Sequence, residues 1–111
     1  MSKLDDVLTK CKDQMTKQGI EIDETLLTNI AKALGPSIYN ADSLVVATGD
    51  EGEMQTVKNW ITKKLGVEAG ADMDACLERC TEKIGKSNTQ KLRPVFYYIV
   101  TKDLGKESVF A

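Results

Sequence analysis

The chain has 111 residues, of which 41% are hydrophobic, with 15 Lys and Arg against 17 Asp and Glu and no His. This length and composition fit one soluble globular domain, residues 1–111, that buries a core without disulfides or metal. The net charge of -2 argues against a strongly basic nucleic-acid binder, and the lack of His removes imidazole-bound zinc and the Ser-His and Cys-His catalytic pairs.

The first residues and the apolar runs point to a cytoplasmic protein with no membrane association. Residues 1–6 contain one Lys and two Asp and lack the apolar stretch of a signal peptide. The longest apolar run, residues 95–100, is far shorter than the roughly 18 residues that a membrane-spanning helix needs. Three cysteines, an odd number, do not suit a secreted disulfide framework and favour a reducing compartment.

Apolar residues recur at helical spacing through the first third of the chain. The first predicted helix is capped by Ser2 and ends at Gly19. Its buried face consists of Leu4, Val7, Leu8, Cys11 and Met15. The second predicted helix is capped by Asp23 and stops at Gly35, which Pro36 follows. Its buried face consists of Leu26, Leu27, Ile30, Ala31 and Leu34.

The middle of the chain is the least regular part of the sequence. Residues 36–40 suit a short helical turn, and residues 44–46 suit a second short piece. A third long helix is predicted to begin near Asp50, with Glu53 at the capping-box position. Its inward face consists of Met54, Val57, Trp60, Ile61 and Leu65.

Two more helices are predicted in the last third of the chain. The fourth starts near Asp72 and packs through Met73, Cys76, Leu77, Cys80 and Ile84. Ser87 and Gln90 form a capping box that opens the last helix, whose apolar face consists of Leu92, Val95, Phe96, Ile99 and Leu104. Pro94 inside this span predicts a kink or a delayed start. Hairpin turns are missing, so the fold class is all-α, a compact single-domain bundle of about five or more helices.

Four short segments share a Lys, an apolar residue and a final Gly. They are residues 32–35, 63–66, 83–85 and 102–105. An internal repeat and four independent helix ends both produce such a pattern. The uneven spacing of the glycines favours helix ends, where the dipole favours a cation and Gly adopts a positive φ.

Cys76 and Cys80 lie four residues apart and therefore share one helix face. Two thiolates at this spacing would supply half of a zinc or cluster site, but only Cys11 remains as a third soft ligand. Both positions fall on the buried stripe, so buried apolar packing is the favoured interpretation. A redox pair stays open as the weaker alternative, because the Cys-x-x-Cys spacing and an adjacent strand are both missing. No metal and no cofactor is predicted.

Residues 85–87 resemble the end of a phosphate-binding loop, but Cys80 stands where that motif needs Gly. Tyr97 and Tyr98, beside Arg93, form an aromatic and basic cluster. Successive helical residues lie about 100° apart, so one tyrosine is expected inside and the other outward. Single-strand binding would need aromatics spread over an exposed platform, so nucleic acid is not an expected partner.

Five segments carry a resemblance to a known family. They are residues 35–42 (GPSIYNAD), 57–60 (VKNW), 63–66 (KKLG), 85–88 (GKSN) and 95–98 (VFYY). With these motifs the chain, from about residue 19 to residue 110, resembles a small uncharacterised bacterial family of domains of unknown function. The resemblance implies a single-domain bacterial protein and no assigned activity, substrate or cofactor.

The two loop motifs suggest a ligand site. We expect residues 35–40 and 85–88 to meet near Arg93 and to form a shallow polar pocket. The candidate ligand-binding residues are Tyr39, Asn40, Ser87, Asn88, Arg93 and Tyr97. The alternative is that these loops only close helix ends against each other, with polar and turn residues that satisfy backbone groups.

Three functions stay open on the sequence. The favoured one is a non-enzymatic cytoplasmic binding or protein-interaction module, because no catalytic constellation exists and a basic last helix follows acidic middle helices. The alternative is a small-molecule or anion-binding protein that uses the loop pocket, with enzymatic activity left open. The third is a helical nucleic-acid accessory. The oligomeric state is also open, because Trp60 and Phe110 suit either the core or a dimer patch.

Overall fold

Helices account for most of the described backbone. The structure, a computed structural model, describes residues 3–35, 44–46, 50–68, 70–84 and 91–110. The α-helices within these ranges are α1 (Lys3–Lys17), α2 (Glu24–Leu34), α4 (Glu51–Trp60), α5 (Ala71–Ile84) and α6 (Arg93–Asp103). A π-helical turn, η2 (Ile61–Leu65), extends α4, and a 3₁₀ turn, η3 (Glu107–Phe110), follows α6. The predicted all-α single domain is confirmed.

Aspartate side chains begin two of the helices, as the sequence predicts. The Asp23 carboxylate accepts a hydrogen bond from the Leu26 N–H at 3.1 Å. The Asp50 carboxylate accepts from the N–H groups of Gly52 at 2.8 Å and Glu53 at 3.3 Å. Each bond satisfies a backbone donor that has no partner within the first helical turn.

Glycines with positive φ end the helices. Gly66, after η2, adopts the left-handed conformation with φ 70° and ψ 23°. Gly35 also has a positive φ of 72°, but its ψ of -157° lies outside the left-handed helical region. With Gly105 at φ 67°, three of the four Lys-and-Gly segments are confirmed as helix ends. Gly85, in the fourth, lies outside the described residues, as do Ser2 and residues 36–40.

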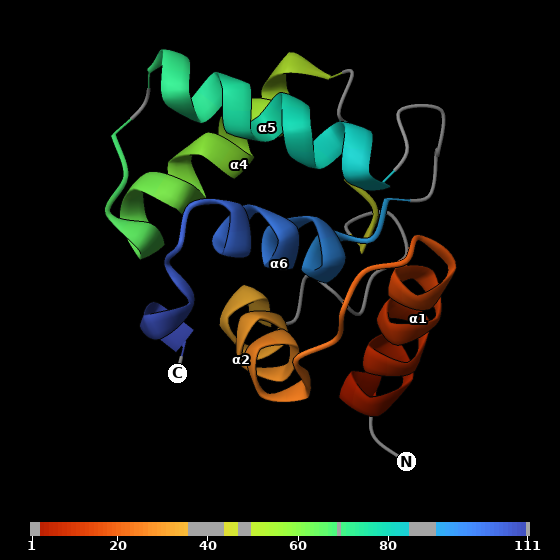
Figure 1. The fold of residues 1–111 in the computed structure, drawn as a ribbon. Helices are drawn as coiled ribbons and strands as arrows, with labels where there is room; N and C mark the ends of the chain where they lie inside the picture. The colour runs from red at the N-terminus through yellow and green to blue at the C-terminus, as the bar shows by residue number, and fades with distance from the viewer. Residues whose placement is uncertain (1–2, 36–43, 47–49, 69, 85–90, 111) are drawn as a thin grey trace.

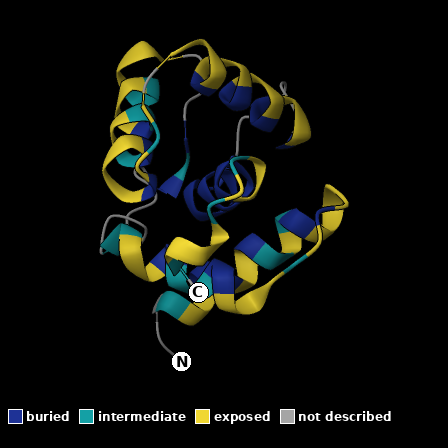
Figure 2. Cartoon of the chain, turned by 60° about the vertical axis from the view of Figure 1, so that its left-hand side comes forward, coloured by how far each residue is buried: buried dark blue, intermediate teal, exposed yellow. Residues whose placement is uncertain are grey.

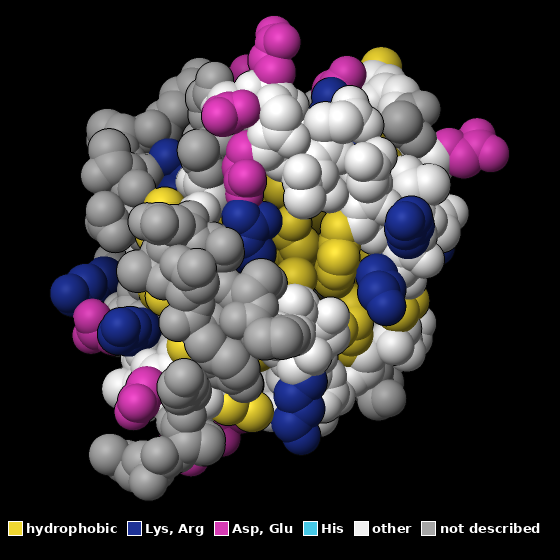
Figure 3. All heavy atoms as spheres, turned by 180° about the vertical axis from the view of Figure 1, so that it is seen from behind, with side chains coloured by type: hydrophobic (Ala, Val, Ile, Leu, Met, Phe, Trp, Pro, Cys, Tyr) yellow, Lys and Arg dark blue, Asp and Glu magenta, His cyan; other side chains and the backbone are white. Residues whose placement is uncertain are grey.

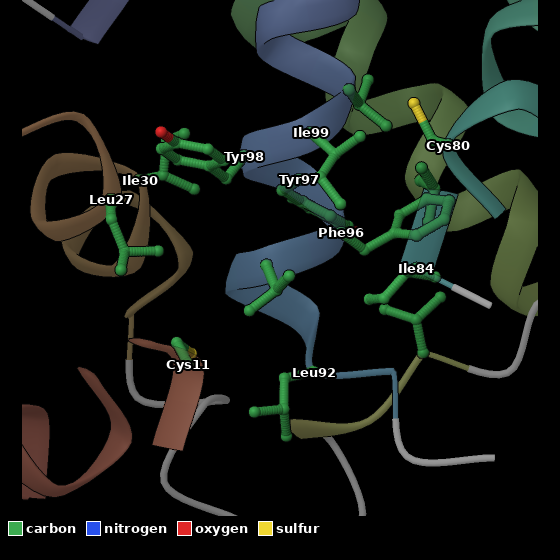
Figure 4. Close-up of a cluster of buried hydrophobic side chains, with 14 of the residues drawn as sticks. Cys11, Leu27, Ile30, Cys80, Ile84, Leu92, Phe96, Tyr97, Tyr98 and Ile99 are labelled. Carbon is green, nitrogen blue, oxygen red and sulfur yellow. The ribbon is translucent and has the colours of Figure 1, made fainter. Parts of the chain in front are cut away.

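The centre of the molecule is α6. In Figure 1 this helix lies between α4 and α5 on one side and α1 and α2 on the other. Every residue from Arg93 to Thr101 is buried, and the helix at the centre of Figure 2 is correspondingly dark blue. Tyr98 points from α6 toward Leu27 and Ile30 of α2, whereas Phe96 points to the side of α5 (Figure 4).

The prediction that one of Tyr97 and Tyr98 points outward is wrong, because α6 is enclosed and both tyrosines are buried. Tyr97 is 2% exposed and Tyr98 is fully buried. The Tyr98 hydroxyl accepts a hydrogen bond from the Asp23 N–H at 2.9 Å and donates one to the Glu21 carbonyl at 2.8 Å. A tyrosine hydroxyl that finds partners in this way can be buried without an unpaired polar atom.

The start of α6 settles the question that Pro94 raised. The helix begins at Arg93 and places Pro94 in its first turn, where the missing N–H costs no helical hydrogen bond. A start at Ser87 is therefore wrong, and the delayed start is confirmed. The preceding residue, Leu92, is extended and forms an isolated antiparallel bridge with Val45. Within residues 44–46, Leu44 is helical and Val45 forms this bridge, so only the start of that segment matches the short piece that the sequence suggested.

The predicted helix faces form one core. Most of their members are buried, and the partly buried ones pack against the core at its edge: Leu4, Leu34, Met54, Trp60 and Leu104. The radius of gyration, 12.8 Å, is close to the roughly 13 Å expected for a compact domain of this length. None of the helices in the described ranges is both long enough and apolar enough to cross a bilayer.

Candidate functional site

Two of the predicted ligand-binding residues, Arg93 and Tyr97, lie together in the first turns of α6. The Arg93 Nη1 donates a hydrogen bond to the Tyr97 hydroxyl at 3.1 Å, and the Arg93 Nη2 forms an ion pair with Glu53 of α4. Arg93 is only 8% exposed. Its guanidinium therefore connects two helices inside the fold and is turned away from solvent.

The partner of Arg93 corrects the prediction for Glu53. The sequence placed Glu53 at the capping-box position of α4, where its carboxylate would accept the N-cap N–H. The Glu53 carboxylate instead pairs with Arg93, 40 residues away. The other four predicted site residues, Tyr39, Asn40, Ser87 and Asn88, lie outside the described residues, so the loop pocket stays a prediction.

Aromatic rings continue this cluster toward the end of the chain. The Trp60 and Tyr97 ring centroids are 4.5 Å apart, and Trp60 stacks on Phe110 with centroids 5.7 Å apart. Trp60 and Phe110 are both partly buried and pack against the core. The buried Trp60 Nε1 finds no acceptor in the described part of the chain. These contacts tie η3 to the end of α4.

A pocket of about 440 Å³ opens on another part of α6. It lies between α5, the second half of α6 and the segment that leaves α1. Its lining residues are Ile20, Glu21, Arg79, Cys80, Lys83, Tyr98, Ile99, Lys102 and Asp103. Sequence reasoning missed this site, because its residues come from three segments whose pairing no local pattern reveals.

Charged groups of both signs surround the pocket. The Arg79 guanidinium binds the Asp103 carboxylate through two hydrogen bonds, Nε to Oδ1 at 3.2 Å and Nη2 to Oδ2 at 2.6 Å. Chiefly through the hydrogen bond, this pairing lowers the pKa of Asp103 and raises that of Arg79. The Lys102 Nζ lies 5.4 Å from the centroid of the Tyr98 ring, within the range of a cation–π contact.

The three cysteines are buried, as the sequence predicts. Burial raises the pKa of the Cys11 thiol to about 12. The hydrogen bond with Cys76, together with burial, raises the pKa of Cys80. The sulfur atoms of Cys76 and Cys80 are 3.9 Å apart, and Cys80 also lines the pocket. A buried thiol with a raised pKa is a poor nucleophile at neutral pH.

The surface on the far side of the molecule carries mixed charge. Figure 3 shows a hollow in which hydrophobic side chains are visible, with Lys, Arg and acidic side chains around it. A track for a nucleic-acid backbone would place basic side chains side by side along one face. In the described part of this face, separate basic side chains stand around the hollow, and acidic side chains lie mainly above it and at the lower left, so no continuous basic track is formed.

The chain has a family but no curated relative. No curated protein matches the sequence. A family model described as a protein of unknown function (DUF2853) matches residues 9–108. This match covers nearly all of the described helices and agrees with the resemblance carried by the loop motifs. The chain therefore belongs to the DUF2853 family of proteins of unknown function.

Proposed function

We propose that the protein is a non-enzymatic cytoplasmic binding module that takes a small organic anion in the pocket between α5 and α6. The observation that carries this proposal is the combination of an apolar wall with a cationic edge. Ile20 and Ile99 supply the wall, while Lys83 and Lys102 supply the cations. The volume of about 440 Å³ falls in the range of small-molecule pockets.

The charges at the pocket favour a ligand with one negative group. Arg79 and Asp103 neutralise each other through their paired hydrogen bonds. Lys83 and Lys102 remain against the single carboxylate of Glu21, which leaves one net positive charge. An aromatic or aliphatic carboxylate or phosphate ester would place its anionic group at the lysines and its apolar part against Ile20 and Ile99.

The same lining argues for binding without catalysis. Two of its candidate nucleophiles are poorly suited to attack a substrate, because the Cys80 thiol has a raised pKa and the Tyr98 hydroxyl is held by two backbone groups. General acid–base catalysis would need a group that titrates near the working pH. The Asp103 carboxylate, with its lowered pKa, stays ionised and paired with Arg79.

Ligand-induced stabilisation tests this proposal. Benzoate and phenyl phosphate should raise the melting temperature in a concentration-dependent way, because a ligand at 100 times its Kd adds about 2.7 kcal/mol to the free energy of unfolding. Benzamide, which has nearly the same shape as benzoate but no charge, should have little effect. Equal shifts from benzoate and benzamide would contradict the role of the lysines.

Two double variants localise the binding. Lys83→Ala with Lys102→Ala should abolish the benzoate effect, since both cations at the pocket are lost. Lys63→Ala with Lys64→Ala removes the same charge from exposed positions in η2 that do not line the pocket. This control variant should respond to benzoate like the unmodified protein. A similar loss in both variants would show that the effect comes from overall charge.

A further inference from the structure

We propose that Cys76, Cys80 and Asp103 form a binding site for a thiophilic divalent cation of the zinc class. The two cysteines lie on successive turns of α5, and Asp103 is the last residue of α6. One donor atom from each residue lies within 4.8 Å of the others. This site lies at the wall of the same pocket, but its donor atoms are not the lysines of the proposed anion site, and the inference does not depend on anion binding.

The distance between the two sulfur atoms fits tetrahedral zinc. Zn–S bonds of about 2.3 Å at a tetrahedral angle place two sulfur atoms about 3.8 Å apart. The Cys76 and Cys80 sulfur atoms are 3.9 Å apart in the folded chain. A cation can therefore bridge both thiolates without a change in the backbone of α5. Because each carboxylate–sulfur separation is at most 4.8 Å, the carboxylate has to close by no more than about 1 Å to complete a set with metal–oxygen bonds of about 2.0–2.2 Å.

The same spacing does not suit a disulfide. Residues four apart on a helix have Cβ atoms about 5–6 Å apart. A disulfide requires Cβ atoms about 3.5–4.5 Å apart. The pair on α5 therefore has a separation that a bridging cation can span, whereas a bond between the sulfurs would require the helix backbone to move. This geometry separates metal coordination from the redox pair that the sequence left open.

Arg79 completes the charge balance of the site. A divalent cation with two thiolates and one carboxylate leaves one net negative charge, which the Arg79 guanidinium neutralises. Arg79 also orients the carboxylate, because two of its nitrogen atoms bind both Asp103 oxygen atoms. A hydrogen-bonded carboxylate keeps lone pairs for a metal, and such outer contacts hold ligands in metal sites.

The pocket gives the cation a path to the buried sulfurs. Cys80, Arg79 and Asp103 all line the pocket, whereas Cys76 lies behind them in the core. An incoming cation displaces the two thiol protons to solvent as the two metal–sulfur bonds form. A water molecule supplied from the pocket takes the fourth position of the tetrahedron.

Cobalt substitution tests the site directly on the reduced, metal-free full chain. One Co²⁺ per chain should bind and produce thiolate-to-cobalt charge transfer in the near ultraviolet, with the intense visible bands of tetrahedral coordination. Zn²⁺ should then displace Co²⁺, as the relative affinities of these ions require. A spectrum without sulfur charge transfer would overturn the proposal.

Matched alanine variants identify the ligands. Cys76→Ala and Cys80→Ala should each weaken Zn²⁺ binding by about 100-fold or more, as judged by competition with a chromophoric chelator. Cys11→Ala removes an equally buried thiol that lies outside the three-donor group and should bind Zn²⁺ normally. Unchanged affinity in either variant of the α5 pair would overturn the site.

Asp103→Ala keeps the test decisive if a core variant fails to fold, because Asp103 is exposed at the end of α6. This variant should fold normally and bind Zn²⁺ about 10-fold or more weakly. Unchanged affinity would remove Asp103 from the site and overturn the proposal as stated. The Lys83→Ala and Lys102→Ala double variant should keep its cobalt spectrum, so failure of anion binding and failure of metal binding are told apart.

Discussion

The charge of Arg93 is held inside the molecule by a partner from another helix. Burial of an ion pair costs desolvation energy, and removal of one partner leaves the other charge without compensation. Arg93 has a side chain that is 10% exposed, whereas that of Glu53 is 24% exposed. The pair connects the first turn of α4 to the first turn of α6 and should contribute more to stability than the surface pairs do.

Glu53→Gln tests this contribution. Loss of one partner from a fully buried pair costs about 3–5 kcal/mol, and the partial exposure of Glu53 lowers our expectation to about 2–3 kcal/mol. Urea unfolding measures the change. In a double-mutant cycle with Arg93→Met, the double variant should lose less than the sum of the two single losses. Additive losses would show that the two side chains do not interact.

Because Cys11 is buried, we expect the free energy of unfolding to fall at alkaline pH. Burial raises the pKa of its thiol from an ordinary value of 9.0 to about 12. The folded state therefore holds the thiol proton more tightly than the unfolded state does. The resulting stability is fully present below about pH 9 and is lost as the pH rises toward 12.

Urea unfolding under reducing conditions at about pH 8 and about pH 10.5 tests this dependence. The unmodified protein should lose more stability between the two pH values than Cys11→Ala, which lacks the titrating group. The pH dependence of stability that remains in Cys11→Ala comes from other buried groups with raised pKa values, including Tyr97. Equal losses in both proteins would contradict the assignment to Cys11.

The sequence predicted which side chains are buried better than it predicted which side chains contact each other. The burial of all three cysteines followed from their place on apolar stripes. The pairing of Glu53 with Arg93 did not. Local spacing placed Glu53 three residues after the N-cap Asp50, as in a capping box, and gave no sign of a partner 40 positions away. Such long-range contacts depend on how helices pack, which residue types do not specify.

At the scale of elements, the sequence predicted those helix ends that have a capping side chain or a terminal glycine. The side-chain oxygens of Asp23 and Asp50 accept backbone N–H groups of the first helical turn. Gly66 adopts the left-handed conformation that ends a helix. The start of α6 was harder, because Ser87 with Gln90 and Pro94 gave two competing signals. The structure follows Pro94, which is compatible with the first turn and costs a hydrogen bond inside a helix.

Gly66 and Gly70 allow a test of whether a positive φ makes glycine favourable at a helix end. Gly66 has φ 70°, and an added Cβ would meet no atom within 4 Å. Gly66→Ala should therefore lower the free energy of unfolding by about 1 kcal/mol through backbone strain alone. At Gly70 an added Cβ also meets nothing, but φ lies outside the positive region.

Gly70→Ala should be close to neutral. The gain of about 0.4–1 kcal/mol from restricting the unfolded chain is offset by the loss of Gly at the N-cap of α5, where the Gly70 carbonyl accepts from the Asp74 N–H and Ala is disfavoured. Thermal and urea unfolding of both variants measure the difference. A similar destabilisation of both would indicate lost packing or solvation at these turns, because only Gly66 has the strained φ. A neutral Gly66→Ala would show that the left-handed conformation relaxes at no cost.

At the scale of the whole molecule, the sequence predicted the fold class and missed the pocket. The apolar stripes of five helices require a common core, which makes an all-α bundle the expected outcome. The pocket and the three-donor cluster arise where α5 meets the second half of α6. Arg79 and Asp103, for example, are 24 residues apart and carry no shared motif. Their meeting is a property of helix packing.

The central position of α6 predicts how the molecule opens. Its residues from Val95 to Val100 are buried on all sides, and α2 and α5 both pack against it. In contrast, η3 has no buried residue. Elements enclosed by the core exchange their amide protons only through global unfolding, whereas exposed ends exchange through local opening.

Native-state hydrogen exchange across a range of low denaturant concentrations tests this order of opening. The amides of the second half of α6 should give an opening free energy equal to the global free energy of unfolding, with the same dependence on denaturant. The amides of η3 should exchange with a much smaller free energy and almost no denaturant dependence. If α6 exchanged together with η3, the α5–α6 packing that builds both proposed sites would not be the stable centre of the molecule.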